Sequence, residues 1–318
     1  MKVERAAHPR SAGIAAFERT AAAVNNWTTW GPEDELGTVN YITPDKVAAA
    51  CRLVTAGRVI QLGVPLDREE GPQATAPRRY NPIHFMDELP VDYVLPGGVG
   101  VADDVLVLPL QTSTQWDSLA HVSYQGRLYG GRDATLVTSH GALRNSIRAI
   151  SGKVITRGVL ADVARQDGVA TLAPGQRVTV ADLDATLRAQ RVEVREGDVL
   201  LVRTGFMAKC RAVGWQGYHG DAPGLAFDTV EWLHRHRVAA VATDTASLEV
   251  KPFDVEGIGV PFHAAALTHM GLLLGEIFDL DELAADCARD GRYEFLFTGG
   301  PMPVTGGVGS FVNPYAVK

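Results

Sequence analysis

The chain has 318 residues, of which 46% are hydrophobic and 21% are charged, so it can bury a large core without disulfides or other cross-links. Its formal net charge is −7 and its basic residues are scattered singly or in pairs, which argues against nucleic acid as a partner. No window approaches the ~18 apolar residues of a membrane span, and the N-terminus lacks the apolar stretch of a secretory signal. We therefore expect a soluble, cytoplasmic protein that does not bind membranes. Three cysteines lie far apart without a CxxC pair, so no structural zinc cluster is expected.

A single domain with an N-terminal addition is the predicted organisation. The sequence has no Ser-, Gly- and Pro-rich linker of the kind that separates domains, so residues 31–318 are taken as one domain. Residues 1–30 carry helix-favouring alanines and predict a helical arm that packs on the body or on a neighbouring subunit. Thr43 and Pro44 then predict a helix start, because threonine supplies a capping oxygen and proline fits the first helical position.

Strands and helices alternate loosely along the rest of the chain. Residues 58–67 have the alternation of a strand, and residues 104–117 begin as a buried strand and continue as a polar stretch. Between them, residues 68–103 are rich in Pro, Gly and charge and predict a long irregular loop, a kind of segment that is often functional. Further strands are predicted at 153–163, 198–203, 238–242, 272–274 and 293–297, with helices that begin near Thr179 and Asp279 and another over 229–237. The pattern indicates a mixed α/β protein.

The first cluster of polar residues that indicates chemistry lies at 111–121, directly after the apolar strand. An extended backbone points alternate side chains to one side, so a single pocket can receive Gln111, Gln115, Asp117 and His121. The alternative is that Asp117 caps a turn and that His121 is an ordinary half-buried polar residue.

Two further clusters follow. Asp244 comes just after a predicted strand, but the run of Asp, Thr and Ser around it is more typical of a turn than of a site. Residues 260–283 contain His263, His269 and Glu276, for which the alternatives are histidines on a helix surface and a carboxylate in the first turn of a helix. The sequence has no nucleophile elbow, P-loop, H-E-x-x-H motif or dinucleotide glycine fingerprint.

The order of these clusters resembles the metal-dependent cyclase family, which includes kynurenine formamidase, isatin hydrolase and trans-dienelactone hydrolase. The family signature H-x-G-T-H-x-D-x-P-x-H corresponds to residues 111–121, and the resemblance extends over about residues 30–318. Thr114, Asp117 and His121 match the signature, whereas both metal-binding histidines are replaced, by Gln111 and Gln115. Two further departures are Ser113 for glycine and Leu119 for proline.

The resemblance also implies site residues, a fold and an assembly. The stretch VPFH at 260–263 resembles the loop that carries another ligand histidine, and Gly-Glu at 275–276 resembles the position of the ligand glutamate. His121, assisted by Asp117, matches the acid/base. The implied fold is a mixed sheet with a barrel-like core and outer helices, and the implied assembly is a homodimer or homotetramer with sites near subunit contacts. The implied metal ligands are Gln111, Gln115, Asp117, His263 and Glu276.

The family's chemistry is hydrolysis of a small amide, imide or lactone. A divalent ion polarises the scissile carbonyl and lowers the pKa of its water, while a histidine moves protons. Amide oxygens at 111 and 115 are harder donors than imidazole nitrogens, so the expected cation is Mn²⁺ ahead of Zn²⁺, with Mg²⁺ also acceptable.

Two alternatives remain open from the sequence. One is a metal-independent hydrolase in which His121 is the base, Asp117 orients it and the glutamine amides donate to a developing oxyanion. The other is a non-catalytic small-molecule binder on the same scaffold. Four aromatic residues are candidates for lining the substrate pocket, although ordinary packing explains each equally well: Trp116, His84, Tyr124 and Tyr129.

Overall fold

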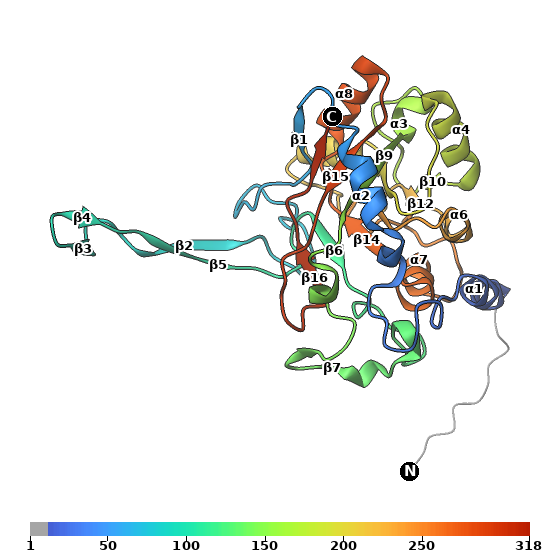
Figure 1. Ribbon diagram of the computed structural model, residues 1–318, viewed down its shortest axis with the longest axis horizontal. Coiled ribbons are helices and arrows are strands. Elements are labelled where there is room, and N and C mark those ends of the chain that lie inside the picture. The colour runs from blue at the N-terminus through green and yellow to red at the C-terminus, as the bar shows by residue number, and fades with distance from the viewer. Residues whose placement is uncertain (1–11) are drawn as a thin grey trace, which may run out of the picture.

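A nine-stranded mixed sheet that curls into a half-barrel runs through the body of the protein (Figure 1). The computed structural model describes residues 12–318. Its parallel centre consists of β9 (Ile155–Asp162), β11 (Val199–Arg203), β13 (Ala240–Thr243) and β14 (Leu273–Glu276). Antiparallel strands extend it on one side, namely β15 (Glu294–Thr298), β17 (Tyr315–Val317) and β1 (Val59–Gln61). On the other side they are β6 (Gln115–Asp117) and β16 (Gly309–Phe311). The mixed α/β prediction with a barrel-like sheet is confirmed.

The central strands are mainly apolar because helices cover both faces of the sheet. In β11, Leu200 and Val202 belong to the core cluster that includes side chains of α4 (Val180–Gln190) and α6 (Thr229–Arg235). Val199 and Leu201 point the other way, into the cluster that includes α8 (Asp281–Asp290). The alternation of side chains along one strand thus joins two cores.

Several helix starts and ends lie where the sequence predicts them. Thr179 and Asp182 form a reciprocal capping box at the start of α4. The helix predicted after Thr43 is α2 (Pro44–Cys51), and Gly291, in the left-handed conformation with φ 72°, ends α8. The other helical elements are α3 (Val163–Gln166), α5 (Phe206–Arg211), α7 (Pro261–His263), η1 (Gly37–Tyr41), η2 (Tyr129–Gly131), η3 (Ala134–Leu136), η4 (Ile147–Ile150) and the π-helical η5 (Ala264–Met270). The remaining short strands are β7 (Val137–Thr138), β8 (Gly141–Ala142), β10 (Arg177–Val178) and β12 (Gly224–Leu225).

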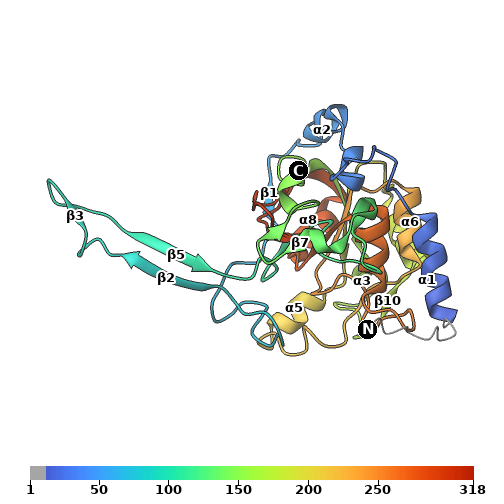
Figure 2. The same cartoon turned by 90° about the horizontal axis from the view of Figure 1, so that it is seen from below.

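The N-terminal helix α1 (Ala12–Ala23) packs on the body of its own chain (Figure 2). Phe17 and Ala21 are buried in the same core cluster as residues of α6 and η5. Residues 1–11 of the predicted arm lie outside the described residues. Among the residues that are described, no helix has the length and apolar character needed to cross a membrane.

The segment predicted as a long irregular loop contains a projecting two-stranded ribbon, so this prediction was wrong. The ribbon, residues 83–107, consists of β2 (Ile83–Glu88), β3 (Val94–Leu95), β4 (Val99–Gly100) and β5 (Asp103–Val107). It extends away from the body in both views (Figures 1 and 2). The buried strand predicted from residue 104 is therefore an exposed strand, because β5 pairs with β2 rather than with the main sheet.

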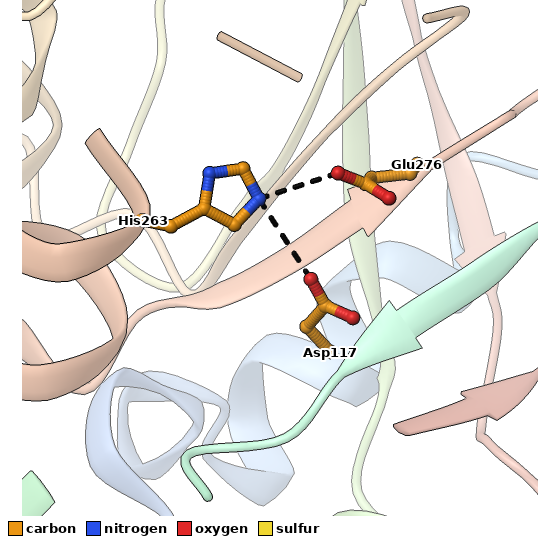
Figure 3. Close-up of side chains that lie close together, drawn as sticks. All are labelled: Asp117, His263 and Glu276. Carbon is orange, nitrogen blue, oxygen red and sulfur yellow. Dashed lines mark hydrogen bonds and ion pairs between the residues drawn. The ribbon is translucent and has the colours of Figure 1, made fainter. Parts of the chain in front are cut away.

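The antiparallel pairing of β14 with β6 brings together segments that are far apart in sequence. Leu274 lies opposite Asp117 and Glu276 lies opposite Gln115. Asp117 and Glu276 therefore come from neighbouring strands of one sheet (Figure 3).

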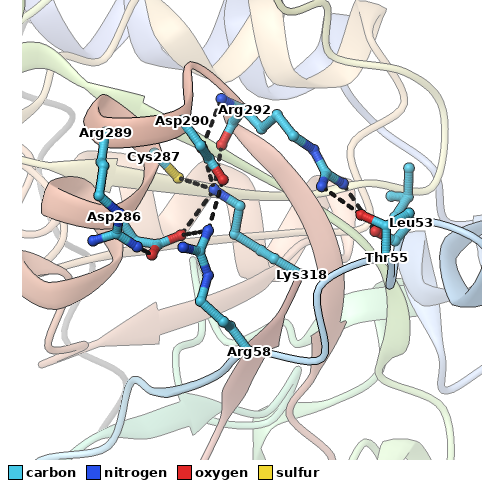
Figure 4. A network of polar contacts seen from close by, with 9 residues as sticks. All are labelled: Leu53, Thr55, Arg58, Asp286, Cys287, Arg289, Asp290, Arg292 and Lys318. Atoms are coloured by element: carbon cyan, nitrogen blue, oxygen red, sulfur yellow. Dashed lines mark hydrogen bonds and ion pairs between the residues drawn. The ribbon is translucent and has the colours of Figure 1, made fainter.

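The last side chain of the chain, Lys318, is fully buried and holds three elements together (Figure 4). Its Nζ lies 2.7 Å from Asp290 Oδ1 and 3.0 Å from Asp286 Oδ2, both on α8. It also donates to the backbone oxygen of Arg292 at 2.9 Å. Arg58, just before β1, pairs with the same two aspartates at 2.8 and 2.7 Å. The network therefore fastens β17 to α8 and to the start of β1.

Replacement of Lys318 by methionine is expected to lower the free energy of unfolding by roughly 3 kcal/mol, the low end of the cost of removing one partner from a buried ion pair. The low end applies because Arg58 still pairs with Asp286. Urea denaturation measures the change. The matched control is Arg289→Met, which removes a partner of Asp286 whose side chain is 59% exposed and should cost less than about 1 kcal/mol. Equal losses in the two variants would contradict the assignment.

Candidate active site

The candidate site lies where β14 ends, on one face of the β14–β6 pair. Because alternate residues of a strand point to opposite faces, Gln115 and Asp117 share a face and Trp116 points to the other. Glu276 is directly opposite Gln115 and so lies on the same face as it. The extended conformation expected for 111–121 holds only for β6, since the chain turns at Thr112, whose N–H donates to Pro109, and again at His121.

His263 completes a compact cluster with the two carboxylates (Figure 3). It ends α7 and enters η5, and its Nε2 lies 3.2 Å from Glu276 Oε1 and 3.8 Å from Asp117 Oδ2. One potential ligand atom from each of the three residues lies within 4.8 Å of the others, and all three side chains are buried. The structure thus brings Asp117, His263 and Glu276, which are distant in sequence, together in one buried cluster.

A third carboxylate, that of Glu249, holds the other side of the His263 ring. Its Oε1 forms a very short contact with His263 Nδ1, and its Oε2 accepts from the backbone N–H of Phe262 at 2.9 Å. Burial by itself disfavours the charged imidazole, but the bonds to Glu249 and Glu276 raise the pKa of His263 to about 10. Sequence reasoning missed Glu249; the only local signal was its position between the apolar residues Leu248 and Val250.

The two glutamines that replace the signature histidines differ in their contacts. Gln115 Nε2 donates to Glu276 Oε2 at 2.6 Å, which leaves Gln115 Oε1 buried and without a protein partner. In the described part of the chain, the other buried atoms of this segment without a hydrogen-bond partner are Gln111 Nε2, Asp117 Oδ1 and His121 Nδ1. Such atoms are costly unless something binds them, so their concentration here indicates a ligand site.

The two carboxylates of the cluster have opposite pKa shifts. Burial raises the pKa of Asp117, and the nearby charge of Glu276 adds to the rise against the opposing effect of His121. Burial alone would also raise the pKa of Glu276. The hydrogen bond from His263 and the charge of its ring outweigh burial and hold the pKa of Glu276 below its usual value. A cation between the two groups would stabilise the ionised form of both.

His121 occupies the outer edge of the cluster. Its Nε2 lies 3.7 Å from Asp117 Oδ1, and its side chain is 23% exposed whereas that of Asp117 is 1% exposed. His121 is therefore more exposed to solvent than Asp117, His263 or Glu276.

Two basic residues near the cluster were not predicted as site residues. Arg79 donates to the backbone oxygen of Gln111 at 3.2 Å, and its charge lowers the pKa of both Asp117 and Glu276. His219 has a ring nitrogen 2.8 Å from the backbone oxygen of Pro72, and burial lowers its pKa. Arg79 lies in the segment that was treated as an irregular loop, so its sequence position gave no indication of the site.

The structure corrects two of the predicted substrate-binding residues. Trp116 is fully buried, donates from Nε1 to the backbone oxygen of Gly299 at 2.7 Å and packs edge-on against Phe278 in the core. It points away from Asp117 because it is the next residue of the strand. His84 lies on the ribbon, where it pairs with Asp104 at 2.7 Å.

The other two predicted residues lie beside the N-terminal region. Tyr124 packs on Phe17 with a ring-centroid distance of 4.7 Å. Tyr129 is buried, and its hydroxyl donates to Asp34 at 2.9 Å. At both positions the aromatic ring packs against the body of the protein.

Asp244 holds the chain between β11 and α5, forty residues away, rather than the local turn that the sequence favoured. Its two carboxylate oxygens accept from the backbone N–H groups of Thr204 at 2.9 Å and Gly205 at 2.7 Å. Burial raises the pKa of Asp244 to about 6 despite these bonds. His269 likewise has a packing role, stacked on Trp27 with a centroid distance of 5.4 Å.

Comparison with known proteins identifies the family. A family model described as "Putative cyclase" matches residues 25–250. The chain belongs to this cyclase family. A solved structure described as a novel cyclase is 38% identical, with a TM-score of 0.84 over 93% of this chain and 100% of that one. A comparison with curated proteins gives no match.

More distant solved structures share the cyclase fold. Isatin hydrolase A from Ralstonia solanacearum is 18% identical with a TM-score of 0.60, over 86% of this chain and 95% of that one. A predicted metal-dependent hydrolase from Bacillus stearothermophilus is 13% identical with a TM-score of 0.53, over 82% of this chain and 98% of that one.

The placement of Trp116 in the core can be tested by stability. Trp116→Ala is expected to lower the free energy of unfolding by about 3–5 kcal/mol, as for other large-to-small changes in a core. The control is His84→Ala, which removes an exposed ion pair and should cost less than about 1 kcal/mol. Guanidinium denaturation measures both. A Trp116→Ala protein as stable as the parent would show that the indole faces an open pocket.

Proposed function

We propose that this protein is a metal-dependent hydrolase that opens a small cyclic amide, imide or lactone at the Asp117 cluster. The observation that carries the proposal is the convergence of Asp117, His263 and Glu276, whose ligand atoms lie within 4.8 Å of one another in a buried position. The family membership and the fold shared with isatin hydrolase support a substrate of this class.

The residues present fit a divalent cation. Asp117 and Glu276 supply carboxylate oxygens, and His263 supplies Nε2 because Glu249 holds Nδ1. The amide of Gln115 is oriented by its bond to Glu276 so that Oε1 is left as a further donor. One imidazole among several oxygens suits Mn²⁺ or Mg²⁺ and accepts Zn²⁺ less readily, so we favour Mn²⁺.

A cation held by these donors would polarise the scissile carbonyl and make water a better nucleophile. His121 accepts a proton from the attacking water and returns it to the leaving nitrogen or oxygen, while Asp117 keeps the ring in position. Arg79 is suited to hold an anionic oxygen of the substrate or of the carboxylate product, since no carboxylate among residues 12–318 forms an ion pair with it.

The geometry favours the metal-dependent scheme over the metal-independent one. The latter needs the amide groups of both glutamines as oxyanion donors, but one N–H of Gln115 donates to Glu276, and the negative charge of that carboxylate beside the amide would repel an oxyanion. A non-catalytic binder would need no proton carrier, whereas His121 lies between Asp117 and solvent.

Two substitutions separate metal binding from proton transfer. Glu276→Gln is expected to lose stoichiometric metal and turnover together, because it removes a ligand and half of the negative charge of the pair. His121→Ala is expected to keep the metal and to lower kcat by roughly 10²–10⁴-fold. Metal content is measured by elemental analysis of protein purified without chelator, and turnover by acid release from a panel of lactones, cyclic imides and N-formyl aromatic amines.

Three results would contradict the proposal. They are the absence of stoichiometric metal in the parent protein, activity that survives chelator, and no acid release from any member of the panel. His84→Ala is the control and should match the parent in metal content and rate, because His84 lies on the ribbon.

Glu249 is expected to position His263 for the metal without binding it. Glu249→Gln should weaken metal affinity by about 10–100-fold, the usual effect of removing the carboxylate that orients a ligand histidine. Competition with a metal-binding dye measures this affinity without reference to turnover. Glu282→Gln, at an exposed position of α8, is the control and should bind metal like the parent. An unchanged affinity in Glu249→Gln would exclude the positioning role.

A further inference from the structure

The amide of Gln111 lies on the site face of the sheet, at the edge formed by β16. Gly309 of β16 is the residue directly opposite Asp117 in β6. Opposite residues of an antiparallel pair direct their side chains to the same face, so a side chain at 309 would point towards the site. A Cβ at this position would lie 2.6 Å from Gln111 Nε2, closer than real Cβ atoms approach other atoms. The absence of a side chain at Gly309 therefore makes room for the Gln111 amide beside Asp117.

Gln111 Nε2 has no hydrogen-bond partner among residues 12–318. The atom is buried, whereas most buried donors in proteins are paired. Gln115 differs, because its Nε2 donates to Glu276. Of the two glutamines, Gln111 is thus the one with a buried and uncommitted donor, and a ligand that carries an acceptor is expected to bind it.

Arg79 adds positive charge at the same edge of the site. Its guanidinium donates to the backbone oxygen of Gln111 at 3.2 Å, and its charge acts to lower the pKa of both Asp117 and Glu276. A neutral N–H donor beside a guanidinium favours an oxygen on which negative charge develops. This edge therefore suits a polarised or anionic oxygen of a ligand rather than a cation.

That oxygen differs from the one that the proposed cation would polarise. The strand order is β14, β6 and β16, so Glu276 and the Gln111 amide lie on opposite sides of Asp117. Neighbouring strands are about 4.8 Å apart, which separates the two sides by roughly 10 Å. An oxygen bound to Mg²⁺ lies only about 2 Å from the ion. A cation between Asp117 and Glu276 thus leaves the Gln111 amide for a second oxygen of the same substrate.

We infer that Gln111 is a specificity-determining residue that donates from Nε2 to the second carbonyl oxygen of a cyclic imide. The inference rests on the proposed function and narrows its substrate class. It predicts that the site opens a ring whose nitrogen lies between two carbonyl groups, one directed to the cluster and the other to Gln111 and Arg79.

The reaction gives the second carbonyl oxygen a role in the chemistry. The oxygen of water bonds to the first carbonyl carbon, and the ring C–N bond then breaks. The electron pair of that bond goes to nitrogen and is shared with the second carbonyl oxygen, where Gln111 and Arg79 stabilise it. Nitrogen takes up the proton that His121 removed from water. The products are a primary amide and a carboxylic acid, which releases the other proton of the water when it ionises.

A lactone has no such second oxygen. Its leaving group is the ring oxygen, so the charge that develops on it is not shared with an atom beside Gln111. A site with a buried donor disfavours a substrate that leaves this donor unpaired. The geometry therefore favours imides over lactones.

Succinimide and γ-butyrolactone are a matched pair of substrates, since the rings have the same size and only the imide has a second carbonyl. Gln111→Leu is expected to lower kcat/KM for succinimide by about 100-fold, the lower end of the effect of removing one oxyanion donor, with little change for γ-butyrolactone. The losses on the two substrates are compared, because the intrinsic reactivity of each ring is the same with both proteins. Gln166→Leu, at an exposed position of α3, is the control and should match the parent on both.

Two further measurements separate this role from others. Gly309→Ala should also lower the rate on succinimide, because its Cβ displaces the Gln111 amide, and should have little further effect in the Gln111→Leu background. Metal affinity, measured by competition with a metal-binding dye, should be the same in Gln111→Leu as in the parent. Weaker metal binding in Gln111→Leu would make Gln111 a ligand and overturn the inference.

The inference and the proposed function fail in different ways. Turnover of γ-butyrolactone without turnover of succinimide would overturn the inference and leave the hydrolase in place, as would equal losses on both substrates in Gln111→Leu. No acid release from either ring by the metal-loaded parent would also overturn the inference. Only the absence of acid release from every member of the wider panel would overturn the proposed function as well.

Discussion

The register of β6 against β14 is the constraint on which the candidate site depends. It places Glu276 opposite Gln115 and Asp117 one step further along the same face. A shift of β6 by one residue would exchange the two faces of the strand, with the carboxylate of Asp117 entering the aromatic core and the indole of Trp116 entering the site. The bond from Trp116 to Gly299 and the pairing of β6 with β16 on its other edge oppose such a shift. The three residues of β6, Gln115, Trp116 and Asp117, thus contribute both to the core and to the geometry of the cluster.

The buried charges of the cluster are compatible with the fold only because they are close together. Asp117, Glu249 and Glu276 are each less than 5% exposed, and a buried carboxylate without a partner is strongly destabilising. His263 contacts all three, and its bonds to Glu249 and Glu276 raise the pKa of its ring. Three carboxylates around one imidazole still leave an excess of negative charge. The cluster therefore has the electrostatic character of a cation site before any cation is considered.

The sequence predicted those parts of the structure whose cause is local. The apolar runs of β9, β11, β13 and β14, the capping box at Thr179 and the terminal Gly291 are read from neighbouring residues, and each appears in the structure. The first half of the ribbon was missed because β2 is exposed on both faces and lies in a segment rich in Pro, Gly and charge. The apolar run of β5 did predict a strand, but it could not show that the partner of this strand is β2 rather than the main sheet. Asp117, His263 and Glu276 were identified by family resemblance, since the residue pattern left turn and helix-surface alternatives open. Glu249 and Arg79 reach the site through contacts distant in sequence, which no spacing rule can show.

The contact of Gln115 explains how the scaffold accommodates the loss of a signature histidine. A neutral imidazole has one nitrogen that donates and another that accepts, and a carboxamide likewise separates a donor from an acceptor on two atoms. Gln115 uses its donor on Glu276 and leaves its acceptor without a protein partner. The substitution therefore preserves the polarity of both ends of the side chain while exchanging a nitrogen for a harder oxygen. In the proposed cation site, this unpaired oxygen is the kind of donor that Mn²⁺ and Mg²⁺ prefer.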